Sequence, residues 1–374
     1  TPCADDTFLD FFYWDTYFTN LGLMRDGFVE QARNNLKVMK HFIHEFGFIP
    51  NADNILHRSQ PPLFTRGVYD LYIFTNDKSV ISDFIDEILT ELKFFETKRM
   101  TKLGLNQYRS DEPIETLREQ YDWLNDRLSG YNESEKQIDW KKLGWDLLSI
   151  AESGWDFTPR YMNNISRFAA HEFINIDLNS LLYDAELKAS EMLKIVDRLD
   201  EAKSLENKAE ERKKLVNKYL INKEGLYIDY NFVEDRPSYF ISAASFYPYA
   251  VGISNDSTSL KKLFERLDME FGLSTCEYRG DDAFYFQWDY PAMWPSNVYF
   301  AYVALKRCGL TSEAKKLRKQ YLDMVDKVFD ETGYLWEKYD SIKGTVQYNP
   351  EYRTPSMMGW TAGVYEFLLS ENIE

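Results

Sequence analysis

The sequence is poor in the residues that build disulfide frameworks and metal centres. Its three cysteines, Cys3, Cys276 and Cys308, are scattered over 374 residues, so one bridge at most could form. The four histidines form no cluster with zinc-ligand spacing. A glycine-rich phosphate loop and the Gly-x-Ser-x-Gly turn of serine hydrolases are also lacking. We therefore expect no metal ion and no other cofactor.

Positive charge and long apolar runs are scarce as well. Lys and Arg total 44 against 61 Asp and Glu, which leaves a formal net charge of −17. We expect no nucleic-acid partner, because binding requires clustered cations that neutralise phosphates. No stretch approaches the roughly 18 uninterrupted apolar residues of a membrane span. A small neutral or cationic ligand fits this charge better.

Aromatic residues, in contrast, are abundant. They make up 16% of the chain, as 26 Tyr, 26 Phe and 9 Trp. Part of them will fill a large core. Trp and Tyr also offer flat apolar platforms with a polar edge, which suit the faces and hydroxyl groups of sugar rings. Their positions along the chain decide between the two interpretations.

Hydrophobic residues recur at intervals of three and four, which predicts a largely helical chain. The segments with this pattern are 27–45, 64–75, 79–101, 135–150, 176–198, 200–221, 257–268, 293–308, 311–329 and 359–370. The stretch 184–221 is rich in Glu, Lys, Leu and Ala. There we expect two exposed helices with many surface charges, joined near Asp200.

Segments rich in Gly, Pro, Asn and Asp separate these helices, and nearly every tryptophan lies in or beside one of them. No Pro/Ser linker divides the chain, so we expect residues 1–374 to form one domain. Alternating helices and long loops favour an all-α fold in which paired helices close into a ring. The loops at one end of the ring would then build the functional site.

Two acids in such loops have surroundings suited to catalysis. Asp156 stands between Trp155 and Phe157 in AESGWDFTPR, 151–160. Desolvation by aromatic neighbours raises the pKa of a carboxyl and keeps it protonated, as a general acid requires. The same residue could instead cap a helix or pair with Arg160.

The second acid, Glu337, lies between Trp336 and Tyr339 in a short, extended segment. As a general base it would stay ionised and hold a water molecule. The alternative is an ion pair with the neighbouring Lys338 or with another surface cation.

Three further segments interleave hydrogen-bonding side chains with aromatic ones. The segment 284–295, FYFQWDYPAMWP, offers Gln287, Trp288, Asp289 and Trp294. The segment 11–18, FFYWDTYF, has the same character, and 58–62, RSQPP, places Arg58 and Gln60 before a helix. Each could belong to the core. Five such loops in one helical protein favour a sugar site instead.

These segments resemble motifs of the trehalase family of glycoside hydrolases. The similar stretches are FYWDTYF at 12–18, RSQPPLF at 58–64, ESGWDFTPR at 152–160, QWDYPAMWP at 287–295, EKYD at 337–340 and EYRTPSMMGWTAGVYEFL at 351–368. They follow the family's order and span nearly the whole chain. The chain also resembles, in part, the related family of processing α-glucosidases and mannosylglycerate hydrolases, through its Ser-Gln-Pro-Pro run.

The resemblance implies an (α/α)6 toroid of the six-hairpin glycosidase type and hydrolysis with inversion at the anomeric carbon. It assigns the general acid to Asp156 and the general base to Glu337. The residues that fall at sugar-binding positions of the family are Trp14, Asp15, Asn51, Arg58, Gln60, Glu115, Trp288 and Glu351. The residues that we add from their own segments are Trp155, Gln287, Asp289 and Trp294.

The chain also departs from the family. Thr7 replaces an arginine, Asp10 replaces a glutamate, and the stretch 112–115 reads Glu-Pro-Ile-Glu in place of Arg-Pro-Glu-Ser. Only Arg109 or Arg118 could compensate there. Each lost arginine removes a charge-assisted contact that discriminates between sugars. The family's helices before the opening motif have no counterpart, so we expect either a different closure of the ring or a longer natural protein.

Three hypotheses follow. The first is an inverting α-glycosidase for a small carbohydrate, an α-glucoside such as trehalose or a related disaccharide. The second is a carbohydrate-binding protein on the same scaffold without turnover, which the lost arginines motivate. The third, a helical toroid of the terpenoid-cyclase type, is disfavoured because only Asp281-Asp282 hints at an acidic metal motif.

Overall fold

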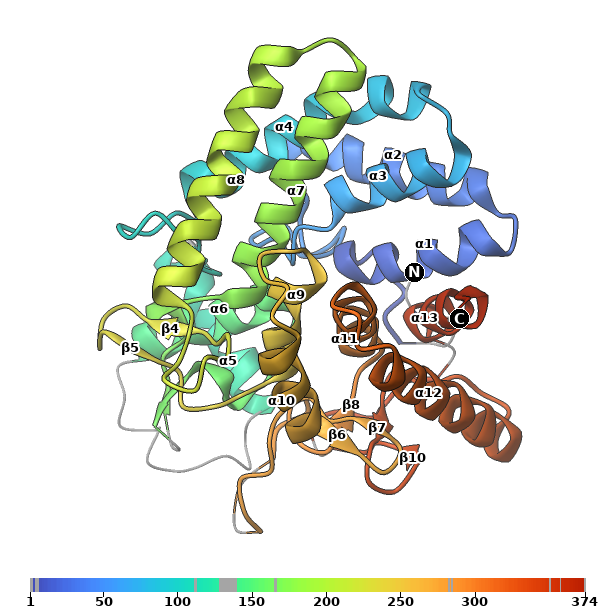
Figure 1. Ribbon diagram of the computed structural model, residues 1–374. Helices are drawn as coiled ribbons and strands as arrows, with labels where there is room; N and C mark the ends of the chain where they lie inside the picture. Colours follow the sequence, from blue (N-terminus) through green and yellow to red (C-terminus); the bar gives the residue numbers. More distant parts are fainter. Residues whose placement is uncertain are drawn as a thin grey trace.

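The computed structural model describes residues 3, 7–110, 113–127, 140–164, 167–281, 283, 285–349, 351–356 and 358–372. Helices dominate this part of the chain, and the strands are short (Figure 1). The helices are α1 (Tyr13–Arg25), α2 (Val29–Phe46), α3 (Phe64–Thr75), α4 (Ser79–Lys98), α5 (Ile114–Arg127), α6 (Trp140–Ser153), α7 (Ile176–Ile195), α8 (Leu199–Tyr219), α9 (Tyr247–Ala250), α10 (Ser257–Leu267), α11 (Pro295–Arg307), α12 (Thr311–Thr332) and α13 (Gly359–Ser370). The strands are β1 (Met162–Asn164), β2 (Arg167–Phe168), β3 (Phe173–Ile174), β4 (Tyr230–Asn231), β5 (Arg236–Pro237), β6 (Asp268–Met269), β7 (Gly272–Leu273), β8 (Ala292–Met293), β9 (Tyr339–Asp340) and β10 (Thr345–Val346).

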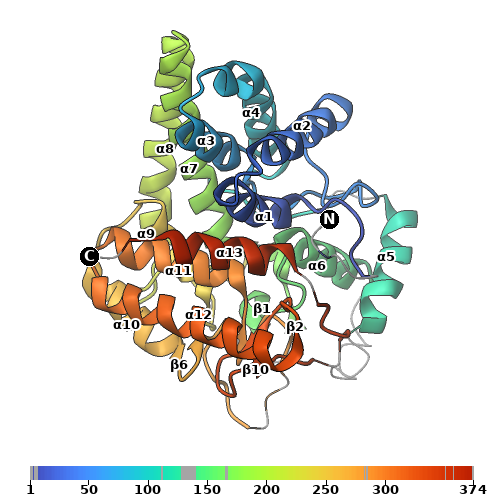
Figure 2. The same ribbon diagram turned by 90° about the vertical axis from the view of Figure 1, so that its right-hand side faces the viewer.

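Neighbouring helices form a closed circuit around the centre of the molecule. α1 contacts α3, α3 contacts α7, α7 contacts α9, α9 contacts α11, α11 contacts α13, and α13 returns to α1. α2, α4, α8 and α12 each pack against the circuit helix that precedes them in the chain (Figures 1 and 2). This arrangement is an (α/α)6 toroid, which confirms the predicted all-α fold class.

Most of the predicted helices are present, with ends shifted by a few residues, but the periodicity does not predict α1, α5 or α9. The expected loop at 11–18 is therefore wrong, because a helix begins at Tyr13. α1 is buried on nearly every side, from Tyr13 through Asn20. A helix that is enclosed all round has no polar face, so its sequence lacks the amphipathic pattern that reveals surface helices.

The prediction of two exposed helices over 184–221 is wrong for the first of them. α7 is buried over most of its length, because α3, α4, α8 and α9 cover it. Its acids are neutralised inside the protein: Asp184 pairs with Arg66 at 2.8 Å, and Glu186 pairs with Arg212 at 2.7 Å. α8 is the outer helix and carries the exposed charges.

Short antiparallel pairings join loops that are distant in the sequence. β9 is the middle strand between β10 and β8. In the pair with β8, Tyr339 lies opposite Met293 and Asp340 opposite Ala292. This small sheet fixes the segment that carries Glu337 beside the segment that carries Trp288.

Two further expectations from the sequence concern disulfide bonds and membrane-spanning helices. All three cysteines carry free thiols, so the one bridge that the sequence permits does not form. Within the described ranges, no helix has both the length and the apolar character that crossing a bilayer requires. Glu112, Asp282, Phe284 and the predicted helical residues 135–139 lie outside the described residues.

The circuit closes where α1 and α13 touch through two glycines (Figure 2). A Cβ atom on Gly22 would lie 2.9 Å from the Cα atom of Gly363. A Cβ atom on Gly363 would lie 1.9 Å from the carbonyl oxygen of Phe18. Because the obstructing atoms belong to the backbone, no side-chain rotation relieves these contacts. Closure at this distance requires glycine at both positions.

We therefore expect Gly363→Ala to lower the free energy of unfolding by about 1–3 kcal/mol or more, since the helices must move apart. Urea denaturation measures this change. Gly67→Ala in α3 is the matched control, because its Cβ would meet only side chains, at 3.3 Å or more. Equal stability of the two variants would contradict the glycine contact between α1 and α13.

Candidate active site

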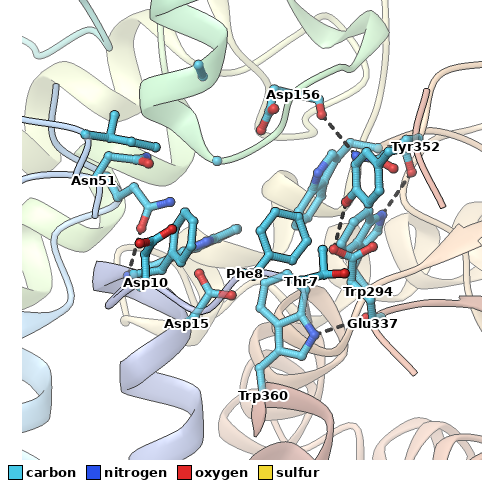
Figure 3. Close-up of a pocket in the computed structure, with 18 of the residues that line it drawn as sticks. Thr7, Phe8, Asp10, Asp15, Asn51, Asp156, Trp294, Glu337, Tyr352 and Trp360 are labelled. Atoms are coloured by element: carbon cyan, nitrogen blue, oxygen red, sulfur yellow. Dashed lines mark hydrogen bonds between the residues drawn. The ribbon is translucent and has the colours of Figure 1, made fainter. Parts of the chain in front are cut away.

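A cavity of about 530 Å³ lies where several of these loops converge (Figure 3). Its walls come from the N-terminal segment and α1, the loop before α3, the turn after α6, and the loops around β8 and β9. The sequence-predicted site residues that line it are Trp14, Asp15, Asn51, Arg58, Gln60, Asp156, Gln287, Trp288, Trp294, Glu337 and Glu351. Residues from distant parts of the chain thus face one space.

Asp156 is placed by a tight turn at the end of α6. Gly154 has a φ of +74°, which favours glycine, and its Cβ would lie 2.8 Å from the Cζ2 atom of Trp14. The backbone therefore passes directly against the Trp14 ring before it reaches Asp156. The carbonyl oxygen of Asp156 accepts a hydrogen bond from Nε2 of Gln287 at 3.2 Å.

The last turn of α6 is anchored by the buried carboxylate of Glu152. Arg99 donates to it three times, at 2.7 to 3.1 Å, from Nε and Nη2. The backbone N–H of Ser59 donates at 3.0 Å, and the backbone N–H of Arg109 donates at 2.7 Å. Glu152 consequently joins the segment that bears Arg58 and Gln60 to the helix that leads to Asp156.

Downstream of Asp156, Arg160 fixes the other end of the turn. Its guanidinium is buried and pairs with Asp177 at 2.7 Å and with Asp229 at 2.9 Å. Asp229 also accepts the backbone N–H of Ile176 at 2.9 Å, at the start of α7. The predicted alternative that Asp156 is the partner of Arg160 is therefore wrong, since both pairing acids come from elsewhere.

Removing this cation should strongly destabilise the fold. Arg160→Ala leaves two carboxylates buried without a counter-charge, which costs about 3–5 kcal/mol of unfolding free energy. Denaturant titration measures it. Arg118→Ala is the control, because its pair with Asp122 is exposed and such pairs contribute less than about 1 kcal/mol. Adding Asp229→Asn to Arg160→Ala should restore part of the loss; no restoration would argue against the charge explanation.

Glu337 is held by two neighbours at the cavity wall. Nζ of Lys338 lies 2.5 Å from Oε2, and the Tyr352 hydroxyl donates to Oε1 at 2.7 Å. The predicted pair with Lys338 thus exists, but it is buried within the site rather than on the surface. The indole N–H of Trp360 donates to the carbonyl oxygen of Glu337 at 3.1 Å, which fixes the backbone.

Four tryptophans form an aromatic wall. Trp288 and Trp294 stack with ring centroids 3.7 Å apart and an angle of 5° between the rings. Trp14 lies 5.5 Å from Trp288 on one side, and Trp360 meets Trp294 edge-on at 5.5 Å. Trp294 also donates its indole N–H to the carbonyl oxygen of Gln287 at 3.0 Å. All four rings line the cavity and offer rigid faces to a ligand.

Polar side chains also line this cavity, and hydrogen bonds fix the loop that carries them. The side-chain oxygen of Gln60 accepts the backbone N–H of Trp14 at 3.0 Å. The backbone N–H of Asn51 donates to the carbonyl oxygen of Arg58 at 2.8 Å, and the carbonyl oxygen of Asn51 accepts the backbone N–H of Tyr13 at 3.1 Å. Asn51, Arg58 and Gln60 therefore reach the cavity from a loop tied to the start of α1.

The carboxyl group of Asp15 lies close enough to both candidate catalytic acids for their charges to affect its pKa. Burial raises the pKa of its carboxyl to about 7, and the charges of Glu337 and, more weakly, Asp156 act in the same direction. Asp156 and Glu337 thus both act on one carboxyl in this cavity. Figure 3 shows Asp156 at one edge of the site, with Asp15 and Glu337 across from it.

This pKa predicts a pH-dependent stability. The folded protein keeps the Asp15 proton up to about pH 7, while an unfolded chain releases it near the ordinary value, so wild-type stability falls as pH rises between these limits. Asparagine cannot ionise. Relative to wild type, Asp15→Asn should therefore gain about 2–3 kcal/mol of unfolding free energy between about pH 5 and about pH 8.

The measurement is denaturant unfolding of both proteins at the two pH values. Asp330→Asn serves as the control, because Asp330 is exposed on α12 and lies outside the cavity lining. A difference between wild type and Asp15→Asn that does not change with pH would show that Asp15 is ionised throughout.

Three predicted binding residues lie outside the cavity lining. Glu115 is exposed on the first turn of α5. Trp155 is buried between the guanidinium of Arg160, at 4.4 Å, and the ring of Trp288, at 5.2 Å. Asp289 pairs with Arg279 and accepts the backbone N–H of Tyr290 at 2.8 Å, and burial raises its pKa to about 6. Trp155 and Asp289 therefore contact the residues and loop that form the cavity wall without lining the cavity themselves.

Sequence reasoning also misses several residues of the lining. These are Phe8, Phe12, Ile55, Trp123, Ala151, Gly154, Tyr352, Arg353, Met358 and Trp360, together with Thr7 and Asp10, which it notes only as departures. The family-like stretch 351–368 contains Tyr352, Arg353, Met358 and Trp360, so a signal for those four was present. Across the described residues, no three His, Cys, Asp or Glu side chains are arranged to hold a metal ion.

The sequence matches known proteins over nearly its whole length. Residues 5–372 match the family model described as trehalase. A periplasmic trehalase of Escherichia coli O1:K1 is 28% identical over 382 residues, and the match covers 96% of this chain and 66% of that protein. The chain therefore spans slightly less than two thirds of the length of this relative.

Solved structures show the same likeness. Neutral trehalase from Saccharomyces cerevisiae has a TM-score of 0.79 at 25% identity, over 97% of this chain and 72% of the yeast chain. A mannosylglycerate hydrolase from Thermus thermophilus, in complex with glucose, has a TM-score of 0.69 at 16% identity, over 98% and 94% of the two chains. The second comparison shows similarity of fold alone.

Proposed function

The chain belongs to the trehalase family of glycoside hydrolases, and on that premise we propose that it hydrolyses an α-glucoside, such as trehalose or a related disaccharide, with inversion at the anomeric carbon. The observation that carries this proposal is the convergence of Asp156 and Glu337 on one cavity, where both raise the pKa of Asp15. Inverting hydrolysis needs two carboxyl groups that flank a single bound sugar.

In the proposed reaction, Asp156 donates a proton to the glycosidic oxygen as the bond to the anomeric carbon breaks. Glu337 removes a proton from a water molecule that attacks the anomeric carbon from the opposite face. The water oxygen becomes the new hydroxyl group, so an α-glucoside yields β-glucose. Lys338 and Tyr352 hold the Glu337 carboxylate in a fixed orientation for this step.

The remaining lining residues suit the binding of one glucose ring. Trp14, Trp288 and Trp294 present apolar faces, while Asn51, Arg58, Gln60 and Glu351 present hydrogen-bonding groups. The transition state carries positive charge on the sugar ring, and a cavity lined by several carboxyl groups stabilises that charge. The net charge of −17 is compatible with a neutral substrate that becomes cationic in the transition state.

A second candidate function is carbohydrate binding without turnover. The observation that favours it is that Lys338 and Tyr352 already hold the two Glu337 oxygens, which leaves fewer lone pairs for the attacking water that a general base must hold. Calorimetry that shows sugar binding together with the absence of hydrolysis would support this alternative. Measurable turnover would end it.

Hydrolysis is tested on trehalose, kojibiose, nigerose and glucosylglycerate, with the released anomer followed by NMR. We expect the attacked glucosyl unit to be released as β-glucose; from trehalose, whose leaving glucose keeps its α configuration, the two anomers should appear initially in equal amounts. Asp156→Asn and Glu337→Gln should each lower kcat by at least about 100-fold, as loss of a general acid or base does. Retention of configuration, or full activity in either variant, would contradict the proposed roles.

Two controls match these substitutions. Glu115→Gln changes an exposed glutamate outside the cavity lining, and Asp330→Asn changes an exposed aspartate on α12. Both should keep wild-type kcat. If Glu115→Gln instead lowers the rate as much as Glu337→Gln does, the site must extend to the first turn of α5.

A further inference from the structure

A second cavity, of about 520 Å³, lies away from the candidate active site. Its walls come from α3, α7, α9, α11 and α13, which are all helices of the closed circuit. The C-terminal turns of α11 and α13 line it, whereas Trp294 and Trp360, at their N-terminal ends, line the candidate active site (Figure 2). Because a helix rises about 1.5 Å per residue, roughly 20 Å of α11 separates Trp294 from Arg307. The two cavities therefore lie at opposite ends of these helices.

Cationic side chains outnumber acidic ones in the second cavity. Its lining contains four cations and two acids, which are Arg66, Lys188, Lys306 and Arg307 against Asp184 and Glu371. Asp70 is close to Arg66 but outside the lining, and burial raises the pKa of its carboxyl, which disfavours the anion. In a protein with a formal net charge of −17, this cavity is therefore a local site of positive charge that attracts anions.

Asp184 is shared between two of these cations. Its Oδ2 atom accepts from Nη1 of Arg66 at 2.8 Å, and its Oδ1 atom accepts from Nζ of Lys188 at 2.7 Å. Nε of Arg66 donates to the hydroxyl of Tyr17 at 3.0 Å. In the part of the chain that the structure describes, Nη2 of Arg66 makes no hydrogen bond. One carboxylate thus faces two cations, and a buried guanidinium retains unused donors.

Arg307 is a cation without a counter-charge. It is exposed at the last residue of α11, and it makes no hydrogen bond or ion pair with any described residue. Its guanidinium lies against Gly252, where a Cβ atom would be only 2.2 Å from Nη2. The φ of Gly252 is +84°, which also favours glycine. The backbone thus makes room for this guanidinium, and its donors remain available to a ligand.

The chemistry of the lining selects among anions. A guanidinium presents its N–H groups in a fork that matches the oxygens of phosphate or carboxylate groups. A phosphate monoester carries close to two negative charges near neutrality, which matches an excess of two cations, whereas a carboxylate carries one. Ala250, Val251, Val303 and Phe367 complete the wall with carbon surface that suits an organic group attached to the phosphate.

We infer that the second cavity is a binding site for a phosphate group, carried by inorganic phosphate or by a phosphate monoester. Arg307 and Nη2 of Arg66 donate to the phosphate oxygens, and Lys188 and Lys306 add positive charge. The inference is independent of the proposed hydrolysis, because none of the residues that line the candidate active site takes part.

Calorimetry on the wild-type protein compares phenyl phosphate, inorganic phosphate and benzoate at about pH 8, where phosphate is a dianion. Chloride keeps the ionic strength constant, because salt screens exposed charges. We expect phenyl phosphate to bind at least about tenfold more tightly than benzoate, which has a similar ring but one charge. Inorganic phosphate that binds at least as tightly as phenyl phosphate supports the free ion as the ligand. Weaker binding of inorganic phosphate supports a monoester.

Arg307→Gln should weaken the binding of phenyl phosphate at least about fivefold, because a charge-assisted donor is lost. The substitution breaks no ion pair, so thermal unfolding should match that of the wild type. Arg118→Gln is the matched control, since Arg118 is exposed on α5 and lies outside the second cavity. It should bind phenyl phosphate as the wild type does.

Val303 provides a second pair of variants that keeps Arg307 in place. It is half-buried on α11 and lines the second cavity. Val303→Glu brings a negative charge into the site, and Val303→Gln brings a side chain of the same shape without charge. We expect Val303→Glu to bind phenyl phosphate at least about tenfold more weakly than Val303→Gln, because like charges repel.

Two outcomes overturn the inference. One is the absence of binding of both phosphate compounds to the wild type at millimolar concentration. The other is binding that Arg307→Gln and Val303→Glu leave unchanged, since the anion then occupies another place, such as Arg58 in the candidate active site. Neither outcome bears on the hydrolysis of α-glucosides, which the kinetic tests of Asp156 and Glu337 decide separately.

Discussion

The buried contact between Glu152 and its donors is the constraint on which the site depends. One carboxylate, fully enclosed, binds the Arg99 guanidinium and the backbone amides of Ser59 and Arg109. Charge-assisted bonds of this kind are strong in a low dielectric, and a missing partner leaves a costly buried charge. The segments before α3 and after α4 are thereby fixed relative to α6. Because Asp156 lies only four residues after Glu152, its position is fixed as well.

A second consequence concerns electrostatics. Asp15, Asp156 and Glu337 share one cavity, and full ionisation of all three would be unfavourable so close together. Lys338 relieves part of this repulsion at Glu337, while burial leaves Asp15 protonated over most of the acidic range. Aromatic rings form part of the walls around these acids. The site therefore combines a Glu337 carboxyl group that Lys338 and Tyr352 hold in place with a carboxyl group at Asp15 that gains or loses its proton near neutrality.

The sequence predicts the parts of the fold that face solvent, because a polar face gives outer helices such as α2 and α12 a clear period. α1 is enclosed by the ring and lacks this contrast between a polar and an apolar face. For the same reason the sequence does not predict that Trp14 and Asp15 lie on a helix. The aromatic residues around Asp156 and Glu337, together with the family resemblance, predict both acids as site residues, and both line the cavity. The sequence does not show which way a side chain points. Asp289 also has aromatic neighbours, but its carboxylate pairs with Arg279. Phe8 and Trp123 have no sequence pattern that marks them.

The glycine contact between α1 and α13 has a consequence for the order of synthesis. α1 emerges from the ribosome long before α13, yet the two form the seam of the ring and are separated by more than three hundred residues of chain. Until α13 is made, the packing that encloses α1 is incomplete. Contacts between such distant segments form slowly, and the exposed surface of the waiting helix favours aggregation. The seam between α1 and α13 can therefore close only late, after nearly the whole described chain has been made.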